Sequence, residues 1–224
     1  MALADWEVIL GGDLVLGSEF VVSGSRALTQ SLNGGATHMV HSATYSDAPK
    51  NVEIRTWMAH RDVAGSSIHL YIGGIARKQS GANTYYYWFL DINIGTDESV
   101  LEVYFNAGYY LDGSQNNIVN EEVTAIFKDL LGDSWGNGIW RFVRMIGYES
   151  GGKFNVSIEM TPDITTPDPS NPPLDQLQAI ASASLDIPTG LANGGACGIV
   201  VGNTWATSST TSGEPYYDYT QLYY

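Results

Sequence analysis

Charged residues are scarce in this chain of 224 residues, and basic ones are the scarcest. Only 15% of the residues are charged, and 24 aspartates and glutamates outnumber ten lysines and arginines, which gives a formal net charge of −14. Such a chain repels phosphate backbones and anionic lipid, so we expect neither nucleic acid nor a membrane surface as a partner. The simplest interpretation of the charge is solubility, although divalent cations are compatible with it.

Cysteine and long apolar runs are nearly absent. Cys197 is the only cysteine, so no internal disulfide can form. It lies in the small apolar stretch 196–201, where we expect a buried thiol rather than a nucleophile. No run of about 18 apolar residues is available to span a membrane. The first ten residues, MALADWEVIL, lack the pattern of a secretory signal, so we expect synthesis in the cytoplasm without one.

Glycine, tyrosine and alternating apolar residues are plentiful, and together they predict strands. The chain has 25 glycines and 14 tyrosines, and 44% of its residues are hydrophobic. In the stretch 52–60, Val52, Ile54 and Met58 alternate with polar residues and with Trp57, which would face the other way. The stretch 85–94, YYYWFLDINI, is the most strand-prone of all. About a dozen such runs, including 19–22 and 26–32, predict an all-β, two-sheet antiparallel sandwich.

Three segments need separate predictions. Apolar residues recur at helical spacing over Ile118–Leu131, with Asn117 as a cap, Glu121 and Glu122 in the first turn and Gly132 at the end, so we expect one short helix there. The proline-rich stretch Thr161–Pro173 should be a long surface loop. The last thirty residues, Gly194–Tyr224, contain two strand-like runs that should be neighbouring strands near the N-terminal ones.

The order of these segments resembles a known family. Along the chain come SGSRAL, APKNVEIRTWMAHRD, YYYWFLDINI, IWRFVRMIGYESGGKFNVSIEM, the proline-rich loop, ASLDIPTGLANGGACGIVVG and YYDYTQLYY. This order is similar to that of concanavalin A-like, laminin-G-like jelly-roll domains, particularly the versions found in bacteriophage structural proteins. The resemblance covers roughly Trp6 to Tyr224. It implies a single concanavalin A-like jelly-roll domain over residues 1–224.

The residue patterns for catalysis are missing. Catalytic members of the resembled fold carry two glutamates and an aspartate on one strand, whereas Asp91-Ile92-Asn93 offers one carboxylate and an amide, too few for an acid and a base. His38 and His41 would point to opposite faces of a strand, which separates them as zinc ligands. We therefore predict that the protein is not an enzyme.

Calcium is the one cofactor that the resemblance suggests. Six oxygen donors lie near turns or strand ends: Asp91, Asn93, Asp97, Asp112, Asp133 and Asp218. Their spacing is not that of a calcium-binding loop, and turn-forming roles are favoured for them. Asp218, between tyrosines in the closing strand, is the first candidate metal ligand. It could equally bond a backbone amide or Arg144.

Aromatic residues are the candidates for ligand binding. Trp57, Trp88, Tyr86 and Tyr104 could line a sheet and stack on sugar rings, together with Tyr85, Tyr87, Tyr109 and Tyr110. The same residue types fill sandwich cores and oligomer interfaces, and this use is favoured over a glycan site.

Two functional hypotheses follow. The first, which rests on the resemblance, is a non-enzymatic virion structural protein. It would be a decoration or accessory subunit of a phage capsid or tail that contacts other virion proteins and forms homo-oligomers. The alternative is a carbohydrate-binding, lectin-like module that recognises host surface glycan through its aromatic residues.

Overall fold

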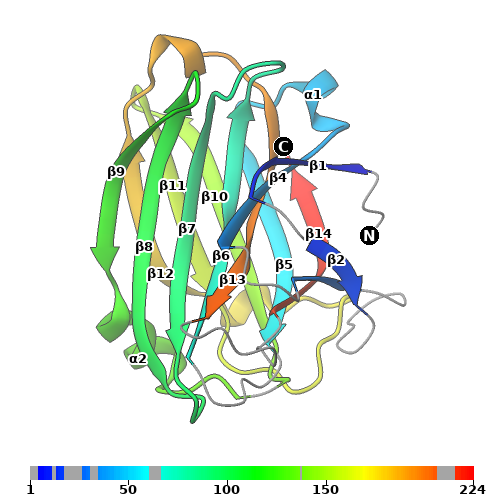
Figure 1. The fold of residues 1–224 in the computed structure, drawn as a ribbon, viewed down its shortest axis with the longest axis vertical. Helices are drawn as coiled ribbons and strands as arrows, with labels where there is room; N and C mark the ends of the chain where they lie inside the picture. Colours follow the sequence, from blue (N-terminus) through cyan, green and yellow to red (C-terminus); the bar gives the residue numbers. More distant parts are fainter. Residues whose placement is uncertain are drawn as a thin grey trace.

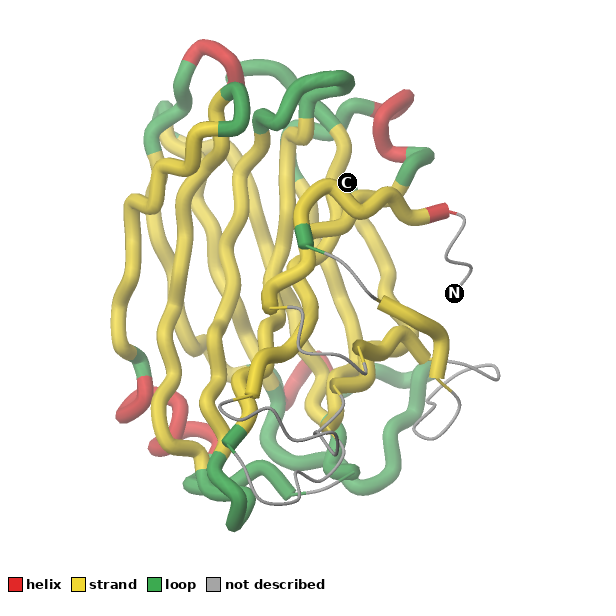
Figure 2. The backbone as a smooth tube through the Cα atoms, in the orientation of Figure 1, coloured by secondary structure: helices red, strands yellow, loops and turns green. Residues whose placement is uncertain are grey.

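Two antiparallel sheets of seven strands each pack face to face in the computed structural model of the protein (Figures 1 and 2). The structure describes residues 5–11, 14–17, 27–30, 35–60, 67–136, 138–205 and 215–224. Sheet A has the strand order β1-β4-β13-β6-β7-β8-β9, and sheet B has the order β12-β11-β10-β5-β14-β3-β2. The predicted two-sheet antiparallel sandwich of the jelly-roll type is confirmed. The predicted strand at 19–22 lies outside the described residues.

The strands match most of the predicted runs. The strands of sheet A are β1 (Trp6–Leu10), β4 (Gly35–His41), β6 (Ile68–Lys78), β7 (Tyr85–Ile94), β8 (Val100–Leu111), β9 (Ser114–Glu122) and β13 (Ala196–Trp205). Those of sheet B are β2 (Leu14–Gly17), β3 (Ala27–Gln30), β5 (Val52–His60), β10 (Arg141–Ser150), β11 (Lys153–Met160), β12 (Gln178–Leu185) and β14 (Pro215–Tyr223). The connections contain the helices α1 (Thr44–Asp47) and α2 (Thr124–Leu131) and the 3-10 turns η2 (Leu174–Gln176) and η3 (Thr189–Leu191). No helix of the described residues has the length and apolar character to cross a membrane.

Alternation along the strands builds the core between the sheets. In β5, Val52, Ile54 and Met58 are buried in the main core, as predicted, and Trp57 belongs to a separate cluster on the outer face of sheet B. Burying an aliphatic or aromatic side chain of this kind contributes about 1.5–3 kcal/mol. The alternation therefore decides which side chains hold the sheets together and which reach the outer faces.

The predicted helix at 118–131 is wrong in its first half. Residues 114–122 form β9, which pairs with β8 through a tight turn at Asp112 and Gly113, both with positive φ. The pairing occupies backbone groups that a helix would need, so α2 begins only at Thr124, and Glu121 and Glu122 lie on the strand instead. The predicted end is confirmed, because the helix stops at Gly132, whose φ is 96°.

The two closing strands are not neighbours, which corrects the prediction for Gly194–Tyr224. β13 lies in sheet A between β4 and β6, and β14 lies in sheet B between β5 and β3. Each does pair with an N-terminal strand, as expected. They meet across the core, where the Tyr217 hydroxyl lies 2.7 Å from the Tyr71 carbonyl oxygen and 3.0 Å from the Gly202 amide nitrogen. Burial raises the pKa of this hydroxyl.

Candidate functional site

The proline-rich loop lies over the outer face of sheet B. As predicted, Thr161–Pro173 contains no strand, and a single bridge fixes the loop through two backbone hydrogen bonds between Trp140 and Ile164. The side chains of Ile164 and Leu177 pack on an apolar cluster of the sheet face that contains Trp57 and Phe142. The loop is thus anchored at both ends by apolar contacts.

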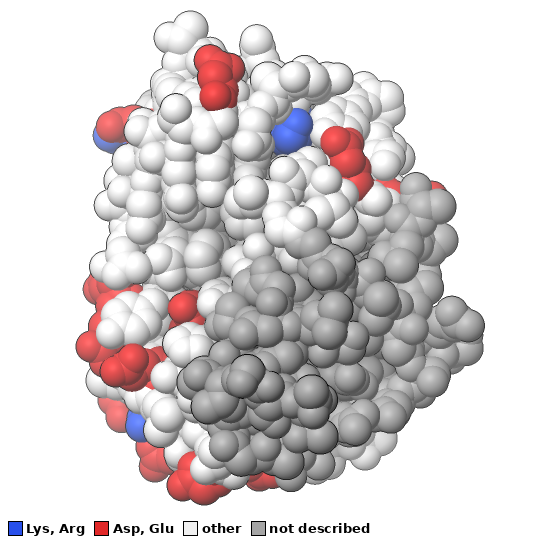
Figure 3. Space-filling view, in the orientation of Figure 1, with Lys and Arg blue, Asp and Glu red and all other residues white. Residues whose placement is uncertain are grey.

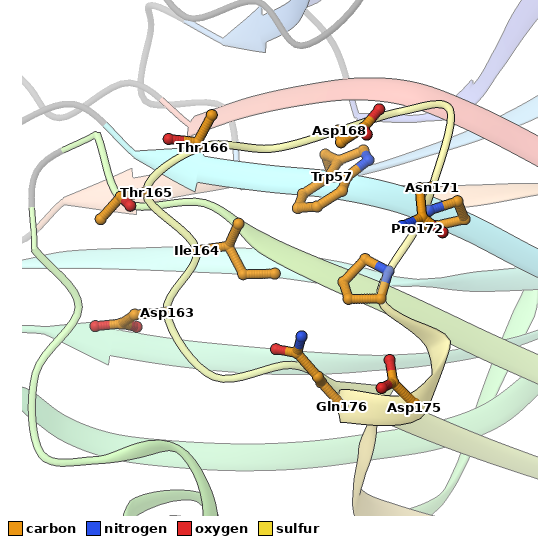
Figure 4. Close-up of a pocket in the computed structure, with 11 residues that line it drawn as sticks. Trp57, Asp163, Ile164, Thr165, Thr166, Asp168, Asn171, Pro172, Asp175 and Gln176 are labelled. Carbon is orange, nitrogen blue, oxygen red and sulfur yellow. The ribbon is translucent and has the colours of Figure 1, made fainter.

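A cavity of about 500 Å³ remains between this loop and the sheet, and we call it the loop cavity. Trp57 of β5 lines it together with ten loop residues between Asp163 and Gln176 (Figure 4). Three of the ten are aspartates, and Asn171, Gln176 and two threonines add further polar groups. Its volume lies in the range of small-molecule sites, and its walls are mostly polar.

Trp57 brings an unsatisfied donor to this cavity. The residue is only 1% exposed, and its ring packs against Phe142 with centroids 5.1 Å apart. No described residue accepts a hydrogen bond from its Nε1. Leaving a buried donor unpaired costs about 1–3 kcal/mol. In Figure 4 the nitrogen-bearing edge of the ring is turned toward the part of the loop with Asp168 and Asn171. The nitrogen itself is buried, so a ligand in the cavity supplies the missing acceptor only where the loop or the ring shifts to admit it.

The aspartates of the loop cavity differ in their partners. Arg141, whose side chain is fully buried, donates from Nη2 to Oδ1 of Asp163 at 2.6 Å. Asp168 Oδ1 accepts hydrogen bonds from the hydroxyl of Ser170 at 2.6 Å and from its backbone N–H at 2.9 Å. These bonds lower the pKa of Asp168, so it is ionised at neutral pH. Asp175 lies in η2, beside Gln176 (Figure 4).

Trp88 and Tyr86 face the core instead of a ligand surface, which corrects their prediction as binding residues. Trp88 is fully buried between the sheets beside Gly74, where an added Cβ would lie 2.3 Å from its ring. Tyr86 stacks on Phe154 with centroids 4.2 Å apart, and its hydroxyl donates to the Asp186 carbonyl oxygen at 2.8 Å. Both occupy positions of β7 that alternation turns inward, so a ligand cannot reach their rings.

Tyr104 lies half-buried on the outer face of sheet A, whereas Trp57 lies on sheet B, so the two do not line one surface as predicted. Its neighbours across the strands are Asp91 on β7 and Glu122 on β9. The charges of Glu102 first, and then of Glu122 and Asp91, raise its pKa. Asp91 also binds Nδ1 of His69 at 2.8 Å, which raises the pKa of this histidine. Figure 3 shows acidic side chains gathered over this lower end of β8 and β9.

Asp218 and Trp57, predicted separately, are direct cross-strand partners between β14 and β5. Asp218 is 2% exposed, and Arg144, its alternative partner in the prediction, forms an ion pair with Glu159. Within the described ranges, no group of three His, Cys, Asp or Glu side chains is arranged to hold a metal ion. Calcium binding at Asp218 therefore stays a prediction. Asp97 accepts a hydrogen bond from the hydroxyl of Ser99, two residues on, as turn residues do, whereas Asp112 accepts one from the hydroxyl of the distant Thr84.

The lone thiol is structural in its surroundings. Cys197 is buried, and its N–H donates to the Thr44 hydroxyl at 3.0 Å. Burial raises the pKa of the thiol to about 12, so a thiolate does not form at neutral pH. This agrees with the prediction of a buried, unreactive cysteine.

Sequence reasoning missed the loop residues of the cavity. Asp168 and Asn171 stand between prolines and Asp175 follows Pro173 closely, and their density in the stretch 163–176 was the available signal. The prediction treated this stretch only as surface. How the loop lies over Trp57 depends on contacts between residues about a hundred positions apart, which a local pattern does not contain.

No family model and no curated protein matches the chain. Among solved structures, the carbohydrate-binding module CBM66 from Bacillus subtilis is similar over 97% of this chain and 94% of its own, with 10% identity and a TM-score of 0.44. The carbohydrate recognition domain of Emp46p matches over 99% and 88%, with 10% identity and a TM-score of 0.45. A GH131 beta-glucanase catalytic domain from Podospora anserina matches over 98% and 85%, with 10% identity and a TM-score of 0.44. At these values the likenesses carry no argument about what this chain binds.

Proposed function

We propose that this chain binds carbohydrate, without catalysis, in the loop cavity. The observation that carries the proposal is the Trp57 indole, a buried donor that has no acceptor among the described residues and lines a polar cavity of about 500 Å³. Buried polar groups in proteins are almost always paired, so this donor calls for an explanation. A bound hydroxyl oxygen provides one.

The walls of the loop cavity suit a sugar. Asp168, Asn171 and Gln176 accept hydrogen bonds from hydroxyl groups, and the two amides also donate to them. Pro172 and Pro173 add apolar surface for the C–H side of a pyranose ring. A few placed polar groups beside apolar surface are what small-molecule sites use to orient a ligand.

The carboxylates of the cavity support binding rather than hydrolysis. Glycoside hydrolysis needs one carboxylic acid with a raised pKa as a proton donor and a second carboxylate opposite it. Asp163 forms an ion pair with Arg141, and the hydrogen bonds from Ser170 lower the pKa of Asp168. A lowered pKa is the reverse of what a general acid requires.

The test is a glycan array followed by titration of the best ligand against three variants. Trp57→Phe keeps a ring but removes the N–H, and we expect it to weaken binding by about 1 kcal/mol, the net worth of one hydrogen bond. Trp57→Ala should abolish detectable binding. The matched control is Trp140→Phe, because Trp140 belongs to the same apolar cluster but does not line the cavity. Unchanged affinity in both Trp57 variants, with the fold intact by circular dichroism, would refute the proposal.

The expected virion role is compatible with glycan binding, because a virion surface subunit can recognise a host glycan. It remains a prediction, as do homo-oligomerisation and contacts with capsid or tail proteins. Mass spectrometry of purified particles tests it directly. Absence of the chain from the particles would remove the virion hypothesis and leave the glycan proposal untouched.

A further inference from the structure

The charges of the loop cavity narrow the class of sugar. Among the residues that the structure describes, three aspartates line it, whereas no lysine, arginine or histidine does. Arg141 compensates the charge of Asp163 in an ion pair, and in the described part of the chain neither Asp168 nor Asp175 forms an ion pair. Three carboxylates against one guanidinium leave two uncompensated negative charges at the cavity.

Two independent features of the cavity therefore define the ligand. Ionised carboxylates are acceptors only, so Asp175, and Asp168 beyond its bonds from Ser170, can accept further hydrogen bonds, and a cationic donor forms the stronger bond. The Trp57 Nε1, on a residue that is 1% exposed, requires an acceptor. A sugar that carries an ammonium group beside its hydroxyls satisfies both demands in one ring. A uronic, sialic or sulfated sugar would instead place a negative charge beside these aspartates.

We propose that the loop cavity selects a sugar with a free amino group, such as a 2-amino-2-deoxyhexose. Its ammonium group is attracted by the uncompensated carboxylates of Asp168 and Asp175, and a ring hydroxyl accepts the hydrogen bond from Trp57. This inference rests on the proposed function of the same cavity. Because Ser170 lowers the pKa of Asp168, that carboxylate keeps its charge at the mildly acidic pH at which the amine of the sugar is protonated.

The experiment compares three β-1,4-linked tetrasaccharides that differ only at C2: glucosamine, N-acetylglucosamine and glucose oligomers. Calorimetric titrations are run at about pH 5, above the ordinary pKa of carboxylic acids and low enough for the amines of the glucosamine oligomer to be protonated. We expect the glucosamine oligomer to bind about tenfold more tightly than the glucose oligomer, because hydrogen bonds to charged groups are the stronger ones. Raising the salt from about 0.05 M to about 0.5 M should reduce this preference.

Two variants that each remove one charge distinguish an effect of the cavity on sugar preference from an effect of the net charge of the whole chain. Asp175→Asn should reduce the preference for glucosamine to about twofold or less, since one of the two uncompensated charges is removed. The matched control is Asp129→Asn, an exposed position of α2 outside the cavity, which should keep the wild-type preference. Circular dichroism of both variants checks that the fold is retained.

The outcomes are distinct. Equal affinity for the glucosamine and glucose oligomers would overturn this inference and leave the proposed function standing. An equal loss of preference in both variants would mean that the net charge of −14 attracts the cationic oligomer generally, which also overturns it. If no carbohydrate binds at all, on the array or in titration, the proposed function fails and this inference fails with it.

Discussion

Trp57 and Trp88 have the same burial in two different regions of the sandwich. Each is at most 1% exposed, and each carries an indole Nε1 for which no described residue is an acceptor. Trp88 lies between the two sheets, among apolar side chains and beside Gly74. Trp57 lies on the outer face of sheet B and lines a cavity with three aspartates. An unpaired buried donor alone therefore does not indicate a binding site, and the proposed site at Trp57 rests also on the polar cavity that this residue lines.

The packing around Trp88 explains why it keeps an unpaired donor. Gly74 and Gly147 leave room for the ring, because a Cβ at either position would lie within 3 Å of it. Phe154 meets the ring edge-on, with centroids 6.2 Å apart. The free energy lost with one unmade hydrogen bond is offset by the free energy gained when the large Trp88 ring is buried between the sheets.

The largest expected effect follows from removing the inner ring. Trp88→Ala should lower the free energy of unfolding by about 3–5 kcal/mol, because it deletes a fully buried ring and leaves a void between the sheets. Urea denaturation measures this loss. The control is Tyr148→Ala, which truncates an exposed aromatic residue and should change stability by less than about 0.5 kcal/mol. A loss below about 1 kcal/mol at Trp88 would show that this region is not the core.

A third buried ring nitrogen, Nδ1 of His38, does have a hydrogen-bond partner. The burial of this histidine predicts that the free energy of unfolding depends on pH. Its Nδ1 lies 3.0 Å from the Tyr85 hydroxyl, and burial lowers the pKa of His38 to about 4. The unfolded chain, with an ordinary histidine pKa of about 6.5, binds a proton before the folded chain does. Stability is therefore complete above about pH 6.5 and is lost as the pH falls toward 4, by about 3 kcal/mol.

Denaturation of the wild type and of His38→Gln at about pH 7 and about pH 4 measures this dependence. The variant should lose less stability on acidification. The matched control, His69→Gln, removes a histidine whose pKa is raised by Asp91, and its charged form stabilises the fold at low pH. That variant should lose more stability than the wild type. The same pH response in all three proteins would contradict the buried, neutral state of His38.

Adding one methyl group beside Trp88 should have a smaller effect. The Cβ of Gly74→Ala would lie 2.3 Å from the Trp88 ring, so the ring or the strand must shift, at a cost of about 1–3 kcal/mol. Gly190→Ala is the control, because its nearest contact is the Leu111 side chain at 3.3 Å. The midpoints of urea unfolding compare the two. A neutral Gly74→Ala would mean that the inner region is loosely packed.

Sequence reasoning succeeded where the cause is local. Alternation in the stretch 52–60 placed Trp57 opposite Val52, Ile54 and Met58, because successive residues of a strand face opposite ways. In the stretch 85–94, alternation could not predict which face points into the core. Tyr85 and Tyr87 on one face are as aromatic as Tyr86 and Trp88 on the other, so the sequence does not distinguish the two faces. Such a strand has buried residues on both faces, as β7 does.

Long-range pairing and loop position were beyond prediction. The two closing strands both have strand-like sequences, yet they join different sheets, because each strand's partners come from segments more than a hundred residues away. The loop cavity has the same origin. Asp168 and Asn171 become candidate binding residues only when the position of the loop over Trp57 is known, and the apolar contacts of Ile164 and Leu177 determine that position.

The smallest expected change in stability distinguishes the two tryptophans most directly. Trp57→Phe removes a donor that has no partner and keeps an aromatic ring, so the free energy of unfolding should change by less than about 0.5 kcal/mol while glycan affinity falls. Trp88→Phe removes the same group but opens a void between the sheets, so it should cost about 1–3 kcal/mol and leave affinity unchanged. Urea denaturation and titration with the same oligosaccharide are run on both variants. If the two variants lose equal stability and neither loses affinity, Trp57 is a core residue like Trp88, and the cavity beside it is not a binding site.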